Sequence, residues 1–145
     1  AIQSALYQTL TNLEVIVIDD ASTDSTVEII KSFSDPRLKV FVNQQNMGVS
    51  AARNRALKEA QGEWIAILDS DDWYATERLE KLIQVAIAQG ADIVIDDLNF
   101  IQSDEKTSWS TLLQESGKQI SSITTIDSAY FVKTDLYGKK GLHLG

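Results

Sequence analysis

Short apolar runs alternate with helix-like segments over most of the chain, and this alternation leaves few ways to fold it. The apolar runs have the length of β-strands and occupy residues 13–20, 38–43, 63–69 and 91–97. The segments between them show helical periodicity and occupy residues 21–33, 49–62 and 75–90. Continuous β-branched runs suit strands buried on both faces of a parallel sheet, so the pattern predicts a doubly wound α/β fold with right-handed crossovers. We therefore expect a three-layer α/β/α sandwich with a mainly parallel sheet.

The two ends of the chain are less regular. Residues 1–9 are expected to form a short helix, and residues 99–122 are polar, weakly periodic and expected to be rich in loops. Residues 128–145 are expected to form one more short helix and a loop. A chain of 145 residues has the length of one domain. Because no linker or repeat indicates a second domain, we expect residues 1–145 to form a single one.

The apolar residues within residues 75–90 recur at helical spacing and predict which side of that helix is buried. The expected inner face consists of Leu79, Leu82, Ile83, Ala86 and Ile87. Glycines predict the ends of helices, because a helix commonly closes on a residue in the left-handed conformation. Gly62 and Gly90 are expected to end the helices that precede them.

The chain is acidic, and its charge excludes some classes of partner. It has 13 Lys and Arg against 21 Asp and Glu, a formal net charge of −8. This balance argues against broad binding to nucleic acid or to an anionic membrane. No apolar run approaches the roughly 18 residues of a membrane span, and the lack of cysteine excludes disulfides and thiolate zinc sites. A phosphate-bearing ligand would therefore need a metal ion or a local basic cluster.

Acidic residues stand at the carboxyl ends of three of the four expected strands. They are Asp19 and Asp20, then Asp69, Asp71 and Asp72, and finally Asp96 and Asp97. Ligands of open α/β sheets bind beyond the carboxyl ends of the strands, so these side chains are expected near one site. Carboxylates this close repel one another. A cation, an Arg or Lys, or water around an exposed turn is expected to compensate them.

The acidic triplet has two interpretations that the pattern alone supports about equally. Asp69 and Asp71 can converge on one Mg²⁺ or Mn²⁺, or on an ion and a sugar hydroxyl. Such ions take oxygen ligands, usually one or two carboxylates together with phosphates and water. Alternatively, the triplet is an exposed polar turn in which Asp72 caps the following helix.

Asp20 and a nearby arginine are further candidates. A carboxylate after a buried strand can accept hydrogen bonds from a ribose or a base, and Asp20 shares its sheet edge with the acidic triplet. Gly48 permits a close approach just before a helix N-terminus. Arg53, in the first turns of that helix, is expected to face a phosphate or the aspartates, whereas Arg55 is expected to face solvent. The neighbours expected to act only as turn and helix cap are Ser22, Thr23 and Asp24.

The aromatic residues and the single histidine carry less information. Trp64 is expected in the core, and Trp73 either walls the pocket or packs in the core. Trp109 is a candidate for contact with a sugar ring only because of its position in the loop-rich segment. His143 is expected to be an ordinary surface residue.

Four motifs, in this order and spacing, resemble the family 2 glycosyltransferases. They are residues 13–26, 43–57, 62–82 and 91–97. Each motif alone is weak, but the series is specific, and the resemblance continues more weakly through residues 128–142. The family consists of inverting, nucleotide-sugar-dependent enzymes of the Rossmann-like GT-A fold. The resemblance implies that residues 1–100 form the nucleotide-sugar-binding part and residues 101–145 the start of an acceptor-side region.

The resemblance also implies roles for individual residues. Asp20 matches the family aspartate that contacts the nucleobase, and Arg53 matches a basic residue of the nucleotide site. Asp69 and Asp71 match the D-x-D motif, with Asp69 towards the ribose and Asp71 on the Mn²⁺ or Mg²⁺ that bridges the diphosphate. Asp72 is grouped with these substrate-binding residues. The implied reaction is metal-assisted transfer of a sugar from a nucleotide diphosphate donor, most often a UDP-sugar, to a glycan or lipid-linked acceptor.

Two features of the family pattern have no counterpart in the sequence. The resemblance implies that the first strand of the fold is missing, with the chain expected to start in the helix that follows it. The general base of an inverting transfer, usually an Asp in an "ED" pair, would fall after residue 145. We therefore expect a donor-binding portion that is inactive alone, with no catalytic residue assigned and with Asp96 or Asp97 lining the acceptor side. The expected location is the cytoplasm, or its face of the membrane if the complete protein associates with one.

Three alternatives remain open at the level of sequence. A phosphate-accepting receiver domain also places an acidic pair after one strand and an Asp after a later one. It would, however, carry a strand-end Ser or Thr and a later strand-end Lys, which we do not find. A dinucleotide-binding oxidoreductase would carry a G-x-G-x-x-G motif, which is lacking. The third alternative is a module that binds a sugar nucleotide without turnover.

Overall fold

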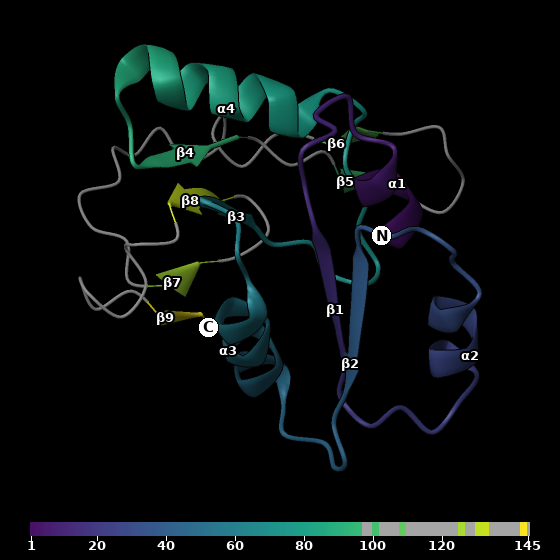
Figure 1. Cartoon of the computed structure of the whole chain (residues 1–145). Coiled ribbons are helices and arrows are strands. Elements are labelled where there is room, and N and C mark those ends of the chain that lie inside the picture. Colours follow the sequence, from purple (N-terminus) through teal and green to yellow (C-terminus); the bar gives the residue numbers. More distant parts are fainter. Residues whose placement is uncertain (97–99, 102–107, 110–124, 127–129, 134–142, 145) are drawn as a thin grey trace.

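The fold is described from a computed structural model (Figure 1), which describes residues 1–96, 100–101, 108–109, 125–126, 130–133 and 143–144. Four helices are present in these residues: α1 (Ile2–Leu6), α2 (Thr26–Lys31), α3 (Val49–Glu59) and α4 (Arg78–Gln89). The first four strands are β1 (Val15–Asp19), β2 (Leu38–Val42), β3 (Trp64–Ala66) and β4 (Ile93–Ile95). The later strands are β5 (Phe100–Ile101), β6 (Ser108–Trp109), β7 (Thr125–Ile126), β8 (Tyr130–Lys133) and β9 (His143–Leu144).

Over residues 1–96, the order and type of the helices and strands confirm the predicted α/β fold. β1 and β2 pair in parallel, from Val15 opposite Leu38 to Asp19 opposite Val42. In Figure 1, α2 lies on one side of this pair and α3 on the other, as expected for a sheet between two layers of helices. The carboxyl ends of both strands therefore point to the same edge.

The other main sheet differs from the prediction. Its strand order is β3-β8-β4, and β8 runs antiparallel to both neighbours, so β3 and β4 are parallel to each other. The prediction of a short helix within residues 128–145 is wrong for residues 130–133, which form β8. Tyr130, Phe131 and Val132 have high strand propensity. Their pairing partners lie far away in the sequence, and local periodicity does not reveal them.

A core cluster lies between α4 and the sheet. It contains the buried side chains of Tyr74, Leu79 and Leu82. The partly buried residues packed against it are Leu10, Leu13, Trp64, Ala66, Leu68, Ile83 and Val94. Trp64 therefore contacts the core, as predicted. None of the helices in the described residues has the length and apolar character needed to cross a bilayer.

The predicted inner face of α4 is confirmed except at one residue. Leu79, Leu82 and Ala86 are buried, whereas Ile87 is 74% exposed. Ile87 follows Leu79 by eight residues, which places it about 80° further around the helix. The prediction for Gly90 is correct, because it has φ 59° and the N–H of Ala91 donates to the carbonyl of Ala86 at 2.9 Å.

Gly62 does not close α3, which ends at Glu59 and is followed by extended backbone at Ala60. Instead, the N–H groups of Gln61 and Gly62 donate to Glu14 Oε1 at 2.6 and 2.9 Å. Lys39 Nζ donates to the other oxygen of Glu14 at 2.7 Å. The Glu14 carboxylate thus joins β1, β2 and the turn that leads into β3.

The Glu14 contacts make stability depend on pH. Burial raises the pKa of the Glu14 carboxyl, but hydrogen bonds from Lys39 and from the N–H groups of Gln61 and Gly62 outweigh it and hold the pKa below its usual value. A lowered carboxyl pKa stabilises the fold above the unfolded pKa, and this contribution is lost as pH falls through the folded pKa. We expect Glu14→Gln to cost about 1 to 2 kcal/mol near neutral pH, allowing for partial exposure of the carboxylate.

Urea unfolding of Glu14→Gln and the unsubstituted chain at about pH 7 and about pH 3 tests this expectation. The difference in unfolding free energy should shrink at the acidic pH. Glu28→Gln, which removes the same charge from an exposed position on α2, is the matched control. A difference of equal size at both pH values would show that the Glu14 charge is not what stabilises the turn.

Candidate functional site

An ion pair brings two of the sequence motifs together at the carboxyl edge of the strands. Arg53, on the second turn of α3, donates from Nη2 to Asp69 Oδ1 at 2.8 Å. Asp69 follows β3 by three residues. The Arg53 side chain is 16% exposed and the Asp69 side chain is 44% exposed. The cation predicted to face the aspartates does so in the structure, and the carboxylate that it contacts is open to solvent.

The other two acids of the triplet lie in a turn. The N–H of Asp72 donates to the carbonyl of Asp69 at 3.1 Å, and Asp71 and Asp72 are exposed. Asp72 does not cap the following helix, because α4 begins at Arg78 with Glu77 at its N-cap position. We call residues 69–72 the acidic turn. Its carboxylates remain accessible to a ligand.

Asp20 is engaged by the loop between β2 and α3. Its carboxylate accepts hydrogen bonds from Asn43 Nδ2 at 2.6 Å, from the N–H of Met47 at 3.0 Å and from the N–H of Gly48 at 2.7 Å. The bond from Asn43 and those from the two backbone N–H groups hold the pKa of Asp20 below its usual value. Asp20 therefore stays ionised and fixes the loop that precedes α3.

The backbone directly after Asp20 has an unusual conformation. Ala21 has φ 63°, a left-handed conformation that residues other than glycine rarely adopt. Asp19 is 3% exposed and its Oδ2 accepts the N–H of Ser22 at 3.1 Å. Asp24 accepts the N–H of Thr26 at 2.9 Å, in agreement with its expected local role at the start of α2. The turn after β1 thus directs Asp19 inwards and Asp20 towards the β2–α3 loop.

Arg55 does not face solvent freely, and the prediction for it is wrong. It donates from Nη1 to the carbonyl of Val42 at 3.2 Å and to Asn43 Oδ1, and its guanidinium lies 5.5 Å from the Phe41 ring centroid. Because Asn43 also donates to Asp20, this amide connects Arg55 to the Asp20 carboxylate. An open cavity of about 620 Å³ lies beside Arg55. The residues that line it are Val42, Asn43, Gln44, Gln45, Met47 and Arg55.

Of the remaining candidate residues, the structure describes the side chains of Trp73 and Asp96 and does not describe those of the others. Trp73 is 60% exposed, so core packing is wrong for it, and its role as a pocket wall stays a prediction. The Asp96 carboxylate is held by Arg78 at 2.6 Å on both oxygens. Asp97 and the side chains of Trp109 and His143 lie outside the described residues, so the predictions for them are not tested.

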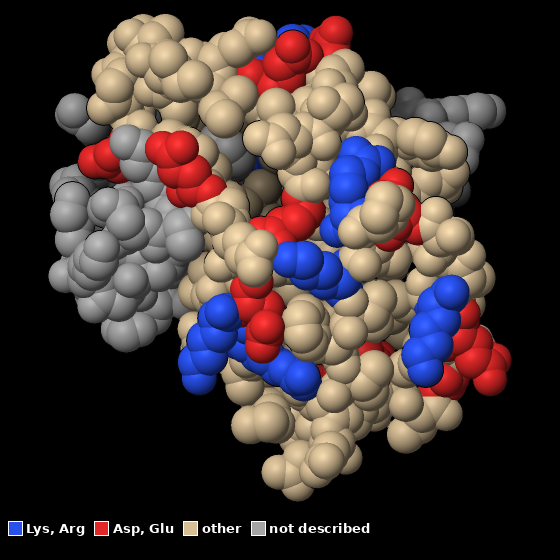
Figure 2. Space-filling view, viewed as in Figure 1, with Lys and Arg blue, Asp and Glu red and all other residues tan. Residues whose placement is uncertain are grey.

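Charges of both signs lie together around the site. Figure 2 shows acidic and basic side chains next to one another across one face of the molecule, without a broad patch of a single sign. Among residues 1–96 and the other described ranges, no three His, Cys, Asp or Glu side chains gather to hold an ion by themselves. The exposed carboxylates of the acidic turn nevertheless fit Mn²⁺ or Mg²⁺, which commonly use one or two carboxylates plus substrate phosphates and water. The remaining coordination positions of such an ion would be filled by phosphate oxygens of the bound substrate and by water.

Several residues of this region were not identified from the sequence. Tyr74 and Arg78 are two of them: Tyr74 lies before α4, and Arg78 starts α4 four residues before the buried Leu82, on the same face of that helix. An arginine in line with buried apolar residues is the signal that was available. Asn43 had no such signal, because its hydrogen bonds to Asp20 and Arg55 depend on two other segments.

The chain matches the family model described as glycosyl transferase family 2 over residues 1–139. The succinoglycan biosynthesis protein ExoO of Rhizobium meliloti is 40% identical over 107 residues, which are 74% of this chain and 31% of that protein. The UDP-Glc:alpha-D-GlcNAc-diphosphoundecaprenol beta-1,3-glucosyltransferase WfaP of Escherichia coli is 45% identical over 82 residues, 57% of this chain and 33% of that protein. The chain thus spans about a third of the length of these relatives.

The fold is also similar to solved structures. The structure of S. aureus TarS in complex with UDP-GlcNAc superposes with a TM-score of 0.73 at 25% identity, covering 98% of this chain and 43% of that one. This likeness confirms the GT-A fold that the resemblance implied. We therefore set aside the receiver and the dinucleotide-binding oxidoreductase as alternatives. The match over residues 1–139 shows that the chain belongs to glycosyl transferase family 2.

Proposed function

We propose that this chain binds a UDP-sugar at the edge formed by the ends of β1, β2 and β3. In the complete protein, the sugar is transferred with inversion to a glycan or lipid-linked acceptor. The observation that carries the proposal is the ion pair between Arg53 and Asp69. The two residues are 16 positions apart in the chain and belong to different motifs, and their contact brings a cation next to a carboxylate at the edge of the sheet where ligands of such folds bind. The TarS complex with UDP-GlcNAc and the name of WfaP support this class of donor.

The proposed roles follow from exposure and charge. Arg53 and the acidic turn hold the diphosphate side of the donor, with Asp69 near the ribose. Mn²⁺ or Mg²⁺ is held by Asp71 with Asp69, and Asp72 contributes to donor binding. The ion supplies Lewis-acid stabilisation of the negative charge on the departing diphosphate. Asp20, ionised and bound to the loop before α3, lies on the nucleobase side.

An inverting transfer also needs a general base to take the proton of the acceptor hydroxyl. We assign this role to none of the described residues. The expectation that the chain alone binds the donor without transferring the sugar stays a prediction.

Calorimetric titration of UDP, first with Mn²⁺ and then with EDTA, tests the proposed function. We expect binding in both conditions and affinity about tenfold or more higher with Mn²⁺, since the ion offsets the repulsion between diphosphate and acidic turn. Titration of ADP under the same conditions is the control for specificity. Equal affinity with and without Mn²⁺ would contradict the proposed role of the acidic turn. Lack of UDP binding in either condition would contradict the donor assignment.

A further inference from the structure

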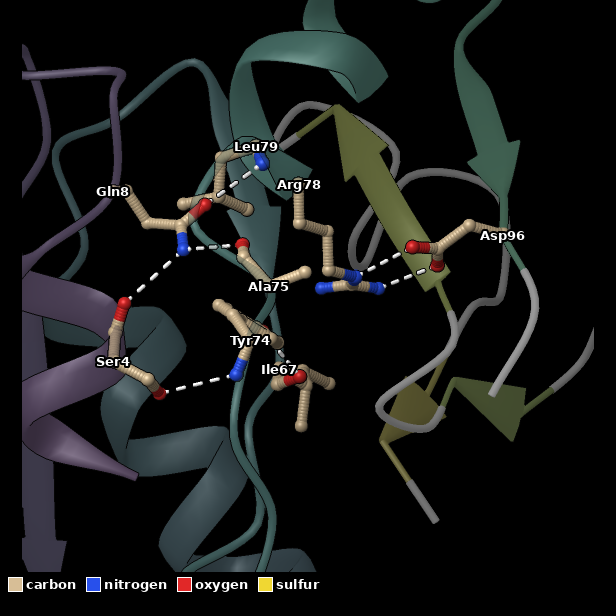
Figure 3. A network of polar contacts seen from close by, with 8 residues as sticks. All are labelled: Ser4, Gln8, Ile67, Tyr74, Ala75, Arg78, Leu79 and Asp96. Carbon is tan, nitrogen blue, oxygen red and sulfur yellow. Dashed lines mark hydrogen bonds and ion pairs between the residues drawn. The ribbon is translucent and has the colours of Figure 1, made fainter. Parts of the chain in front are cut away.

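Arg78, whose side chain is largely buried, holds in place the segment between the acidic turn and α4. The Arg78 side chain is 9% exposed. Its Nε and Nη2 each donate to one oxygen of Asp96 at 2.6 Å, and its guanidinium lies 4.3 Å from the centroid of the Tyr74 ring. Figure 3 shows Arg78 between the tyrosine and the aspartate. Since Asp96 directly follows β4, this contact joins the start of α4 to the end of a strand.

Tyr74 closes the same segment from the side of β3. Its hydroxyl donates to the carbonyl of Ile67 at 2.6 Å, so residues 67 and 74 are held together on either side of the acidic turn. The Tyr74 side chain lies in the core cluster, and burial raises the pKa of its hydroxyl. The hydroxyl is therefore protonated near neutral pH and acts as a donor.

Helix α1 and the residues after it hold the segment from a third side (Figure 3). Ser4 Oγ accepts the N–H of Tyr74 at 3.1 Å. The buried side chain of Gln8 donates to the carbonyl of Ala75 at 2.7 Å and accepts the N–H of Leu79 at 3.0 Å. The backbone on the α4 side of the acidic turn is thus fixed by three different elements, whereas Asp71 and Asp72 themselves project into solvent.

Stability alone is a poor reason for the pair of Arg78 and Asp96. Desolvation of two charges offsets most of their attraction, and well-packed apolar residues are often as stabilising as a buried ion pair. A guanidinium differs from an apolar side chain, and from an ammonium, in that its rigid fork fixes the orientation of both partners. The geometry of the pair is therefore a better explanation for its presence than its energy.

We propose that Arg78 is a positioning residue for the acidic turn, acting through Tyr74 and Asp96 without touching the donor. The fork on Asp96 sets where α4 starts relative to β4, and the stacked Tyr74 ring transmits that placement to Ile67. Asp69 and Asp71 are in this way presented at a fixed place to a metal-bound diphosphate. The inference rests on the proposed function, and it assigns a role to residues that the sequence motifs leave without one.

The test separates position from stability by replacing Arg78 with Lys, which keeps the charge and loses the fork. We measure the ratio of UDP affinity with Mn²⁺ to UDP affinity with EDTA. In Arg78→Lys this ratio is expected to fall about fivefold or more, while the affinity in EDTA changes by less than about twofold, because only the acidic turn is displaced. Urea unfolding of the same proteins reports the stability separately.

Arg37→Lys is the matched control. Arg37 donates from Nε and Nη2 to the two oxygens of Asp35 at 3.0 and 2.9 Å, so it has the same fork in a turn before β2. This variant is expected to leave the metal-dependent ratio unchanged. If Arg78→Lys does not fold, the double variant Arg78→Met with Asp96→Leu replaces the partly buried pair by apolar groups. It too should lose most of the ratio.

The possible results are distinct. A reduced ratio in Arg78→Lys or in the double variant, with a normal ratio in Arg37→Lys, supports the positioning role. A normal ratio in the folded Arg78 variants, whatever their unfolding free energy, overturns the role and leaves the proposed function intact. Lack of UDP binding by the unsubstituted chain overturns the proposed function and the positioning role together.

Discussion

Replacing Asp71 with Ala is expected to remove the metal-dependent part of UDP binding. The Asp71 side chain is exposed in the acidic turn, and a metal ion that a diphosphate also binds usually takes only one or two carboxylates from the protein. Loss of one should lower the affinity measured with Mn²⁺ by about tenfold or more and leave the affinity in EDTA nearly unchanged. Calorimetry of the variant and of the unsubstituted chain in both conditions measures this difference.

The control for Asp71→Ala is Glu63→Ala. Glu63 is also exposed but lies just before β3, at the opposite end of that strand, so the variant removes the same charge away from the site. Neither substitution should change the unfolding free energy by more than about 0.5 kcal/mol, as is usual for exposed residues. Retention of the Mn²⁺ effect in Asp71→Ala would exclude this residue as a ligand. An equal loss in Glu63→Ala would indicate that net charge alone explains the effect.

Asp69 differs from Asp71 because it already has a cationic partner. Its ion pair with Arg53 would be exchanged or shared when a phosphate arrives, since a guanidinium binds carboxylate and phosphate in similar geometry. The same contact explains how an acidic chain tolerates an acidic turn before any ligand binds. The positive group that the sequence led us to expect beside these carboxylates is therefore Arg53, which pairs with Asp69.

The elements that the sequence predicted correctly are those whose signal is local. The β-branched run before Asp19 and the apolar spacing before Gly90 each lie within one element, and neither needs information from elsewhere. β8 was missed because its position between β3 and β4 depends on pairing with Trp64–Ala66 and Ile93–Ile95. No pattern within residues 130–133 distinguishes a central antiparallel strand from another apolar segment.

The same distinction applies to the site. Arg53 facing the aspartates was predicted because one rule, that ligands bind at the carboxyl ends of strands, brings both motifs to one edge. The interpretation of Arg55 failed because its partners, Val42 at the end of β2 and Asn43 directly after it, belong to another element and only the tertiary structure brings them to Arg55. Arg78 was overlooked for a related reason. Only the tertiary structure shows that Asp96 lies opposite its guanidinium.

The largest loss of stability is expected from Leu82→Ala in α4. Leu82 is 5% exposed and belongs to the core cluster with Tyr74 and Leu79. Truncating a buried leucine removes its transfer free energy and leaves a cavity, which together cost about 2 to 5 kcal/mol. In a domain of this size the melting temperature should fall by roughly 2 to 4 °C for each kcal/mol.

Ile87→Ala is the matched control, because it removes a side chain of the same size from the same helix at a position that is 74% exposed. It is expected to change the unfolding free energy by about 0.5 kcal/mol or less. Calorimetric melting and urea unfolding of both variants compare the two faces directly. Similar losses would mean that Ile87 is covered in solution. Because the Leu82 cluster includes Tyr74, which closes the acidic turn, Leu82→Ala should also weaken Mn²⁺-dependent UDP binding, whereas Ile87→Ala should leave it unchanged.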